Sequence, residues 1–259
     1  MASESHRSTI RVLDIMETLS ASENGLTLTE IAEKVSAPKS SIFPIIHTLL
    51  DRKYLELNEY TGKYSIGLSI FALCASFLEH RNIYNYVLEE MKDIVSKCSE
   101  ACQLGILEKN EVLYIGKVDS PQPVRMASHV GTRLPANCAS LGKALISDLN
   151  RSELEEIFEG GMKALTDKSI VDMDRLCEEL ENINKSGIAQ ECEEVAEQIR
   201  CFAVPLRKNG KIKAAIGVTI PLFRVTDEKI DEIRNLLFSA QMKIEKIMKE
   251  LDGSIKMQM

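Results

Sequence analysis

Long hydrophobic runs are absent from this 259-residue chain. No stretch approaches the ~18 consecutive apolar residues that a helix needs to cross a bilayer. The first nine residues, MASESHRST, are polar and lack the apolar core of a secretory signal peptide. A disulfide scaffold is also absent, because the seven cysteines are odd in number and scattered through the chain. The sequence therefore predicts a cytoplasmic protein in a reducing compartment, without a membrane partner.

Motifs for metal or phosphate chemistry are missing as well. Cys98 and Cys102 stand one helical turn apart, but no second pair follows at metal-ligand spacing, and the four histidines are dispersed. The Gly-Lys pair at 142–143 lacks the upstream glycine of a phosphate-binding loop, because position 137 holds Asn. We therefore expect neither a bound metal nor a cofactor.

Residues 27–50, TLTEIAEKVSAPKSSIFPIIHTLL, have the pattern of two helices joined by a tight turn. Thr27 is placed to cap the first helix, and Glu30 completes a capping box. Pro38 suits the first turn of the second helix. Short polar or cationic side chains open that helix: Lys39, Ser40 and Ser41. Apolar side chains supply its buried side: Ile42, Ile45, Ile46, Leu49 and Leu50. Polar groups at the start of a second helix suit phosphates and base edges, so it is predicted to be a recognition helix.

Two short strand patterns follow that helix. The chain reads YLEL from Tyr54, then NEYTG, then KYSI from Lys63, which predicts a hairpin around a turn containing Gly. Such a wing can lay Lys63 or Tyr60 along the phosphate backbone or in the minor groove. Residues 1–66 are therefore predicted to form a winged helix-turn-helix domain. Its expected DNA contacts are Lys39, Ser40, Ser41 and His47, with Arg52 and Lys63 on phosphates.

The net charge of −7 argues against indiscriminate binding of polyanions. Residues 1–66 carry seven Lys or Arg against nine Asp or Glu, a net charge of −2. Within them, however, residues 34–53 hold four basic residues against one acidic residue, Asp51. The basic residues are thus confined to a short segment. Useful affinity for DNA should therefore come from two DNA-binding domains, which we call heads, that bind the two half-sites of one operator, and this affinity should depend markedly on salt.

Residues 67–81 are predicted to be a helical linker that also dimerises the protein. The segment GLSIFALCASFLEH, residues 67–80, is apolar almost all round a helical projection. Such a helix should be buried, and on a linker the expected cover is the same helix of a second subunit. The residues expected in this dimer contact are Leu68, Ile70, Phe71, Leu73, Phe77 and Leu78.

Residues 82–259 alternate helix and strand patterns in an order suited to an antiparallel sheet. Strand pairs are predicted around Lys109-Asn110 and around Asn209-Gly210. Helices are predicted over residues 82–100, 140–149 and 172–185, with a final helix capped by Thr226. Helices packed on an antiparallel sheet define an α+β fold.

Several runs resemble one known family from about Thr9 to near Asp252. In the first half they are RVLDIM from Arg11, LTEIA from Leu28, PKSS from Pro38, and Leu55. In the second half they are GTRLP from Gly131, SLGKA from Ser140, residues 187–191, RCFAVP from Arg200, AAIGVTIP from Ala214, and Arg224. The chain thereby resembles the IclR family of bacterial transcription regulators. The resemblance implies a GAF-like effector-binding second domain, and thus a repressor or activator controlled by a small molecule.

The same resemblance implies an effector site at Met126, Leu134, Ser140, Leu141, Glu191, Cys201 and Thr219. Free N–H groups at the start of the Ser140 helix would receive a carboxylate, while Thr219 and Cys201 offer further hydrogen bonds, so an organic acid is expected. Any one of these apolar residues can equally be core packing. Two departures from the family pattern stand out. Pro44 replaces an arginine of many relatives and should bend or loosen the helix, and Cys138 should alter the pocket volume.

The sequence thus predicts a ligand-responsive, DNA-binding repressor, not an enzyme, that forms a dimer or tetramer. The alternative is a small-molecule sensor or cysteine-dependent enzyme whose first domain mediates protein contacts. Such an enzyme would need Cys138 or Cys201 in contact with His129, and nothing local places them together.

Overall fold

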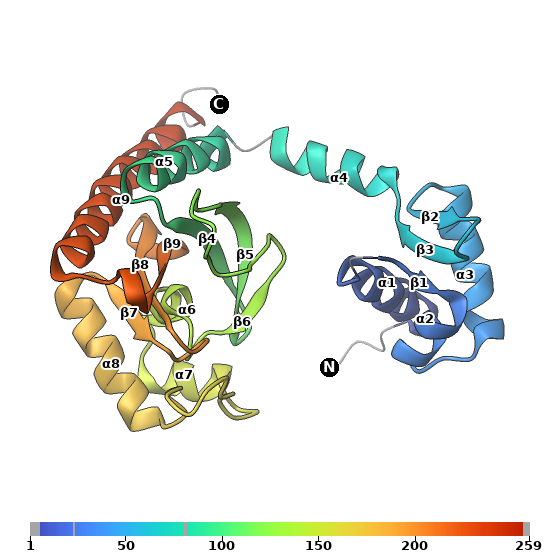
Figure 1. Ribbon diagram of the computed structural model, residues 1–259, viewed down its shortest axis with the longest axis horizontal. Coiled ribbons are helices and arrows are strands. Elements are labelled where there is room, and N and C mark those ends of the chain that lie inside the picture. Colours follow the sequence, from blue (N-terminus) through green and yellow to red (C-terminus); the bar gives the residue numbers. More distant parts are fainter. Residues whose placement is uncertain (1–5, 23, 80–81, 256–259) are drawn as a thin grey trace. The chain divides into compact units, whose positions relative to one another are not determined.

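The computed structural model describes residues 6–22, 24–79 and 82–255 (Figure 1). For residues 75–79, 82 and 251–255 it describes the backbone alone. The chain divides into two compact units, residues 1–81 and 82–259. Among the described helices, none combines the length and the apolarity of a membrane span.

The first unit is a winged helix-turn-helix with one further helix after the wing. Its elements are α1 (Arg7–Ser20), β1 (Leu26–Thr27), α2 (Leu28–Lys34), α3 (Lys39–Asp51), β2 (Leu55–Asn58), β3 (Lys63–Ile66) and α4 (Leu68–Glu79). The sheet is antiparallel in the order β1-β3-β2. The predicted helix pair and wing are confirmed, whereas the two-residue strand β1, too short to give an alternating pattern, was not predicted.

Local chemistry explains how α2 and α3 are set. Thr27 Oγ1 accepts from the Glu30 N–H at 3.4 Å, and the Thr27 N–H donates to Glu30 Oε2 at 2.7 Å, which is the predicted capping box. Ser36 makes the turn with a positive φ of 49°. Ile42 and Ile46 of α3 are buried at 0% and 1% exposure against Ile15 of α1, so the rotation of α3 about its axis is fixed.

Pro44 does not interrupt α3, which runs from Lys39 to Asp51. A proline here lacks the N–H that would bond to the Ser40 carbonyl, but both residues are on the exposed side, where that carbonyl can meet water. Thr48 Oγ1 donates to the Pro44 carbonyl at 2.8 Å. The expectation of a loosened helix is therefore not supported by the helical assignment.

Helix α4 begins directly on the wing. The Gly67 N–H donates to the Tyr54 carbonyl at 2.8 Å, and Ser69 Oγ donates to the Arg52 carbonyl at 2.8 Å. A Cβ at Gly67 would lie 2.5 Å from the Lys53 carbonyl oxygen, so only glycine fits this junction. The side chains of Phe77 and Leu78, which we expected in a dimer contact, lie outside the described part of the chain.

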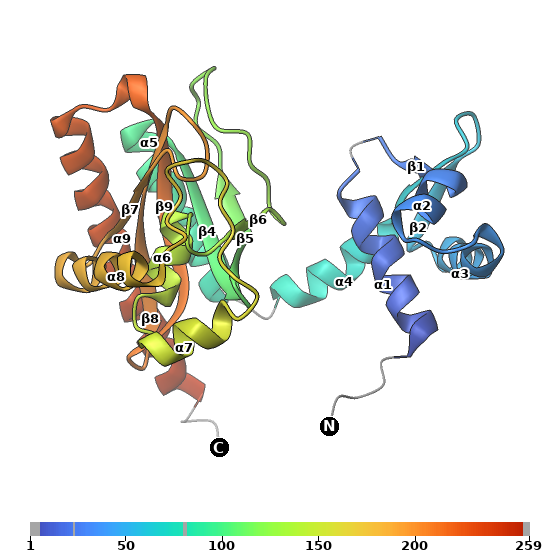
Figure 2. The same cartoon turned by 90° about the horizontal axis from the view of Figure 1, so that it is seen from below.

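The second unit is an antiparallel sheet with helices on both faces, as predicted (Figures 1 and 2). The sheet order is β6-β5-β4-β9-β8-β7. Its strands are β4 (Ala101–Glu108), β5 (Glu111–Val118), β6 (Arg133–Pro135), β7 (Ala189–Cys192), β8 (Ile199–Lys208) and β9 (Lys211–Pro221). Its helices are α5 (Asn82–Cys98), α6 (Ser140–Ile146), α7 (Arg151–Ile157), α8 (Met173–Ser186), the short 3₁₀ helix η1 (Leu222–Arg224) and α9 (Asp227–Ile255).

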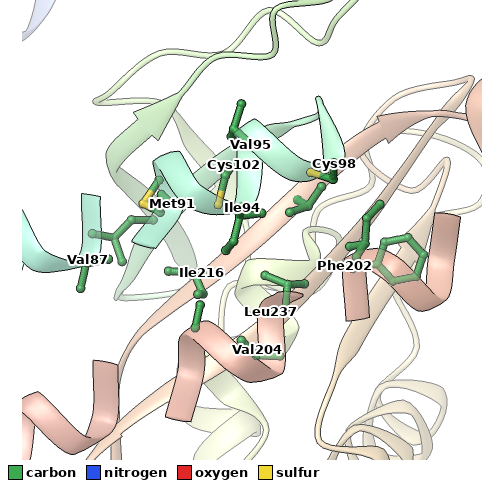
Figure 3. Packing of buried hydrophobic residues seen from close by; sticks show 14 of the residues in the cluster. Val87, Met91, Ile94, Val95, Cys98, Cys102, Phe202, Val204, Ile216 and Leu237 are labelled. Carbon is green, nitrogen blue, oxygen red and sulfur yellow. The ribbon is translucent and has the colours of Figure 1, made fainter. Parts of the chain in front are cut away.

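Two apolar clusters lie on opposite faces of that sheet. Helices α5 and α9 cover one face, where Met91 and Ile94 of α5 and Leu237 of α9 pack against Ile216 and Phe202 (Figure 3). Helices α6, α7 and α8 form the second cluster on the other face. The sheet is thus enclosed on both sides, and polar side chains on the α6 face are buried.

Turns and caps follow the predicted chemistry at several points. Asn209 and Gly210 both have positive φ, 52° and 76°, in the β8–β9 hairpin. Gly187 closes α8 with φ 75°, and Thr226 Oγ1 accepts from the Lys229 N–H at 3.2 Å at the start of α9. Helix α7, capped by Asn150, and the short strands β6 and β7 were not predicted as such.

Candidate DNA-reading face and effector site

The exposed side of α3 carries most of the predicted DNA contacts. Lys39 and Ser40 are exposed at its first turn. Ser41 is half-buried and its hydroxyl donates to the Pro38 carbonyl at 2.7 Å, so its oxygen can still accept. His47 is exposed further along the same helix, and its Nδ1 lies 3.2 Å from Asp51 Oδ2. These four residues therefore share one accessible helix.

Two exposed residues of α3 were missed by the sequence reasoning. Phe43 is 50% exposed although it is a large apolar side chain, and its ring centroid is 6.1 Å from that of His47. Thr48 is exposed beside it. A partial signal was available, because Thr48 falls opposite Ile42 and Ile46 on a helical projection and the predicted buried side of the helix did not include Phe43.

The two expected phosphate contacts are placed differently. Arg52 is exposed directly after α3. Lys63 is half-buried in the middle strand of the sheet, opposite Thr27 and Asn58. Its charge, together with that of Lys34, adds to the lowering of the Glu30 pKa, which is caused first by hydrogen bonds from Thr27. Lys63 thus lies directly after the wing turn, at the start of β3, whereas Tyr60 is fully exposed within that turn.

A row of buried polar side chains crosses the sheet of the second unit. In register, Glu191 of β7 lies opposite Cys201 of β8, which lies opposite Thr219 of β9. Cys201 Sγ is 3.5 Å from Thr219 Oγ1, and Thr219 Oγ1 donates to Gln103 Oε1 on β4 at 3.2 Å. All four residues are buried, so we call Glu191, Cys201, Thr219 and Gln103 the polar row.

The polar row has an unused group at each end. Within the described part of the chain, Gln103 Nε2 and Glu191 Oε1 have no hydrogen-bond partner. Burial of such groups without a partner costs about 1–3 kcal/mol each. One end therefore offers a donor and the other an acceptor. Gln103 was not predicted, because a glutamine in an apolar strand has no local signal.

Titration of the row is shifted by its burial. Burial raises the pKa of Glu191, although its Oε2 accepts from the N–H groups of Glu194 at 2.8 Å and Val195 at 3.4 Å. Burial first, and then the neighbouring Glu191 charge, raise the pKa of Cys201 well above 9.0. Burial likewise raises the pKa of Tyr114, with smaller effects from Cys201 and Glu191. All three groups therefore share one weakly polar interior.

A cavity of about 10 Å³ adjoins the row and gathers most of the expected effector residues. Its lining includes Met126, Ser140, Leu141, Cys201 and Thr219, joined by the unpredicted Gln103, Tyr114 and Val195. Glu191 is one strand away from the lining residue Cys201. Leu134 does not line it, because it lies in β6 opposite Val112. About 10 Å³ holds roughly one water molecule, so an organic effector requires the site to open.

Helix α6 packs unusually close to the sheet beside this cavity. A Cβ at Gly217 of β9 would lie 2.7 Å from the Phe202 carbonyl and 3.3 Å from Leu141 Cγ. A Cβ at Gly142 would lie 2.4 Å from Ala136 Cα. Ala139 precedes the helix without a side-chain cap, and Ala139, Ser140 and Leu141 line the cavity.

A buried ion pair holds the loop after Glu191. Lys143 of α6 is fully buried, and its Nζ lies 2.6 Å from Glu194 Oε1 and 3.8 Å from Glu179 Oε1. Glu194 in turn presents its backbone N–H to Glu191. Burial raises the pKa of Glu194, with Lys143 acting in the opposite direction. Lys143, which the sequence did not place in a phosphate-binding loop, pairs with a buried carboxylate and holds it in position.

The loop 119–132 covers the cavity through Met126 and is tied down on both sides. Arg224 makes a two-pronged pair with Glu100, at 2.6 and 2.7 Å, and donates to the Val124 carbonyl at 3.0 Å. Lys117 Nζ donates to the Ser128 carbonyl. Loss of these hydrogen bonds would free the loop that carries Met126.

The cysteines considered for catalysis have other partners. Cys138 Sγ donates to the Lys163 carbonyl at 3.2 Å and does not line the cavity, contrary to its expected effect on pocket volume. Cys201 contacts Thr219, and the His129 ring nitrogen lies 3.0 Å from the Val130 carbonyl oxygen. Cys98 and Cys102 pack in the apolar cluster under α5. The geometry brings none of these cysteines to His129.

A winged helix-turn-helix joined to a closed sensor fold defines a transcriptional regulator. The model described as "Bacterial transcriptional regulator IclR C-terminal" matches residues 75–246, and "IclR helix-turn-helix domain" matches residues 8–59. The chain belongs to the IclR family of transcriptional regulators, whose members are regulators and not enzymes.

Similar proteins agree over nearly the whole chain. The HTH-type transcriptional regulator KdgR of Escherichia coli is 28% identical over 93% of this chain and 92% of its own length. The transcriptional repressor IclR of the same organism is 25% identical over 90% of this chain and 87% of its own. An IclR homolog from Microbacterium hydrocarbonoxydans, solved in complex with 4-hydroxybenzoate, has a TM-score of 0.81 at 21% identity, covering 92% of this chain and 99% of that one.

Proposed function

We propose that this IclR-family regulator is a repressor that a small carboxylic acid releases from its operator. The observation that carries the proposal is the polar row, whose unused Gln103 donor and Glu191 acceptor are both buried. Gln103 lines the cavity, and Glu191 lies one strand beyond the lining residue Cys201. Buried polar groups are normally paired, so two unpaired groups of opposite kind suggest a ligand that supplies both partners.

The ligand's orientation follows from charge. A carboxylate would be repelled by an ionised Glu191, so it belongs at the other end, near Gln103 Nε2 and the Ser140 and Leu141 N–H groups. A hydroxyl or amine at the far end would then donate to Glu191 Oε1. The 4-hydroxybenzoate bound by one protein of this fold has a carboxylate and a hydroxyl at opposite ends. Met126 would close over the ligand, and Leu134 would join only after the site opens.

Release from DNA requires the ligand to favour one state. A ligand shifts an equilibrium only by the difference between its affinities for the two states. The cavity of about 10 Å³ is too small for such an acid, so binding selects an opened sensor. We propose that the opened sensor changes the spacing of two DNA-binding heads in a homodimer, or in a tetramer joined through the sensors. The regulator acts in the cytoplasm, where bacterial DNA is.

A calorimetric screen of small hydroxy and amino acids tests the ligand proposal. Thr219→Val should weaken binding by roughly 1–3 kcal/mol through a lost buried hydrogen bond. Thr219→Ser, which keeps the hydroxyl, is the matched control. Glu191→Gln should change which acids bind while leaving folding intact. Thr219→Val and Glu191→Gln should each weaken ligand-induced release from the operator in proportion to the ligand affinity that the variant loses. If an acid bound with the same affinity to the parent, Thr219→Val and Glu191→Gln, its site would lie elsewhere.

The DNA-contact proposal is tested by substitutions in the winged helix-turn-helix domain of the full-length protein. We propose that Lys39, Ser40, Ser41 and His47 contact DNA, with Arg52 and Lys63 on phosphates. Arg52→Ala should weaken all sequences alike and flatten the salt slope by about one unit, since one phosphate contact is lost. Lys39→Ala should instead relax the sequence preference at one position. Adding Ser41→Ala should reduce operator affinity further. Lys185→Ala, an exposed cation on α8 of the sensor, is the control. Unchanged operator binding by the double variant would refute this DNA face.

A further inference from the structure

The middle of the recognition helix is apolar although it is exposed. Phe43 is 50% exposed, and Pro44 is exposed next to it. Exposure here is not loose packing, because the buried side chains of Ile42 and Ile46, at 0% and 1% exposure, fix the rotation of α3. An apolar side chain of this size held outward on a DNA-binding helix calls for an apolar partner.

Thr48 extends this apolar strip by one helical turn. Its hydroxyl donates to the Pro44 carbonyl at 2.8 Å, four residues back along the helix. With the hydroxyl turned to the backbone, the methyl group is the part of Thr48 left for other contacts. Pro44 and Thr48, four residues apart, therefore lie one above the other on the helix, and Phe43 borders this row beside Pro44. We call these three residues the apolar strip.

Charge is arranged around the strip and not within it. Lys39 precedes it at the start of α3, and Arg52 and Lys53 follow the end of the helix. Between them, exposed residues 43–48 include no Lys or Arg, and His47 is paired with Asp51 at 3.2 Å. Cations at the two ends of a helix in the major groove suit the phosphates that border the groove, while its middle faces the base edges.

Only one base presents an apolar group in the major groove. Guanine is read by Arg or Lys and adenine by Asn or Gln, whereas thymine offers its C5-methyl group to Phe or to a Thr methyl. We infer that the apolar strip reads thymine methyl groups, so that each operator half-site has thymines facing Phe43 and Thr48. The inference rests on the proposed DNA-binding function and adds the base composition of the operator.

The test uses the full-length protein and a duplex selected by it from a random DNA library. Thymines of the selected site are replaced by deoxyuracil, one symmetric pair at a time, which removes only the methyl group. At the positions facing the strip, affinity should fall about fourfold per methyl, and about 15-fold for both half-sites together. Thymines elsewhere in the duplex should be insensitive.

Phe43→Ala assigns the effect to its residue. This variant should bind the thymine and uracil duplexes almost equally at one position, while its melting temperature stays close to that of the parent because the side chain is exposed. Phe223→Ala removes an exposed phenylalanine of the sensor, 68% exposed, and should keep the full thymine preference.

Each other outcome overturns the inference. Equal affinity for thymine and uracil duplexes at every position would show that no methyl is read. A thymine preference that survives Phe43→Ala would move the reading elsewhere, and loss of dimerisation in that variant would make Phe43 a protein contact. Failure to enrich any duplex would overturn the DNA-binding proposal itself, which the first two outcomes leave intact.

Discussion

The recognition helix and the polar row handle polar chemistry in opposite ways. On α3, Lys39 and Ser40, which we propose as DNA contacts, are exposed. In the sensor, Glu191 and Gln103 are 2% and 1% exposed, and Gln103 lines a cavity of about 10 Å³. One site is an open surface on a rigid helix, and the other is a closed interior with unpaired groups.

This difference assigns the energetic roles of the two units. The open face costs nothing to expose, so its affinity depends on how many heads bind together. The proposed effector site would have to open before an acid could enter, so the free energy of opening would be subtracted from the acid's affinity. Under this proposal the sensor is the part with two states, as a switch requires.

The largest expected effect comes from separating two heads. Leu68 and Phe71 of α4 are 69% and 70% exposed, which a lone chain would leave in water. Phe71→Glu should split the proposed dimer and lower operator affinity on the order of 10³-fold, since bivalent binding is lost. Sedimentation velocity and a DNA-binding titration measure the two effects together.

Phe223→Glu is the control for Phe71→Glu, because it adds the same charge to an equally exposed phenylalanine of the sensor. It should leave assembly unchanged. A Phe71→Glu monomer at micromolar concentration that still binds its operator tightly would show that one head is sufficient, and the contrast between the two units would lose its energetic basis.

The same contrast explains what the sequence could predict. The capping box at Thr27 and Glu30, the wing turn and the Asn209-Gly210 hairpin depend on neighbours in the chain, and all three were predicted correctly. The polar row joins β7, β8, β9 and β4, so its completion by Gln103 depends on a pairing between residues over a hundred positions apart. Local pattern carries no such information, and family resemblance supplied only part of the row.

A second prediction concerns the Lys143 and Glu194 pair. Lys143→Met removes the buried ammonium and leaves Glu194 buried without its partner, which should lower the free energy of unfolding of the sensor by about 3 kcal/mol. Denaturant unfolding measures it. The head should unfold as before, since Lys143 and its partners all belong to the second unit.

The double variant Lys143→Met, Glu194→Leu separates the pair from simple packing. Replacing both charges by apolar groups should restore most of the lost stability. If the double variant were as unstable as Lys143→Met, the cost would come from the shape of the lysine side chain and not from an unpaired carboxylate. Ligand affinity should stay low in both variants, because the loop that orients Glu191 has lost its anchor.

The smallest effect tests whether burial sets the chemistry of the polar row. Burial raises the Glu191 pKa above its ordinary value of 4.5, and the nearby Glu194 charge adds to this. The folded protein therefore holds this proton more tightly than the unfolded chain. As pH rises from about 4.5 through the raised value, the contribution of Glu191 to the free energy of unfolding should be lost progressively.

Glu191→Gln removes that titration, so its stability should fall less than that of the parent over this pH window. Glu194, Cys201 and Tyr114 titrate in both proteins, and their contributions cancel in the difference to the extent that they are independent of Glu191. Glu178→Gln, on the exposed surface of α8, is the control and should leave the pH profile unchanged. Parallel profiles for the parent and Glu191→Gln would mean that Glu191 ionises as readily inside the sensor as in water. Burial would then not set the chemistry of the polar row, and in this respect the row would not differ from the exposed face of the recognition helix.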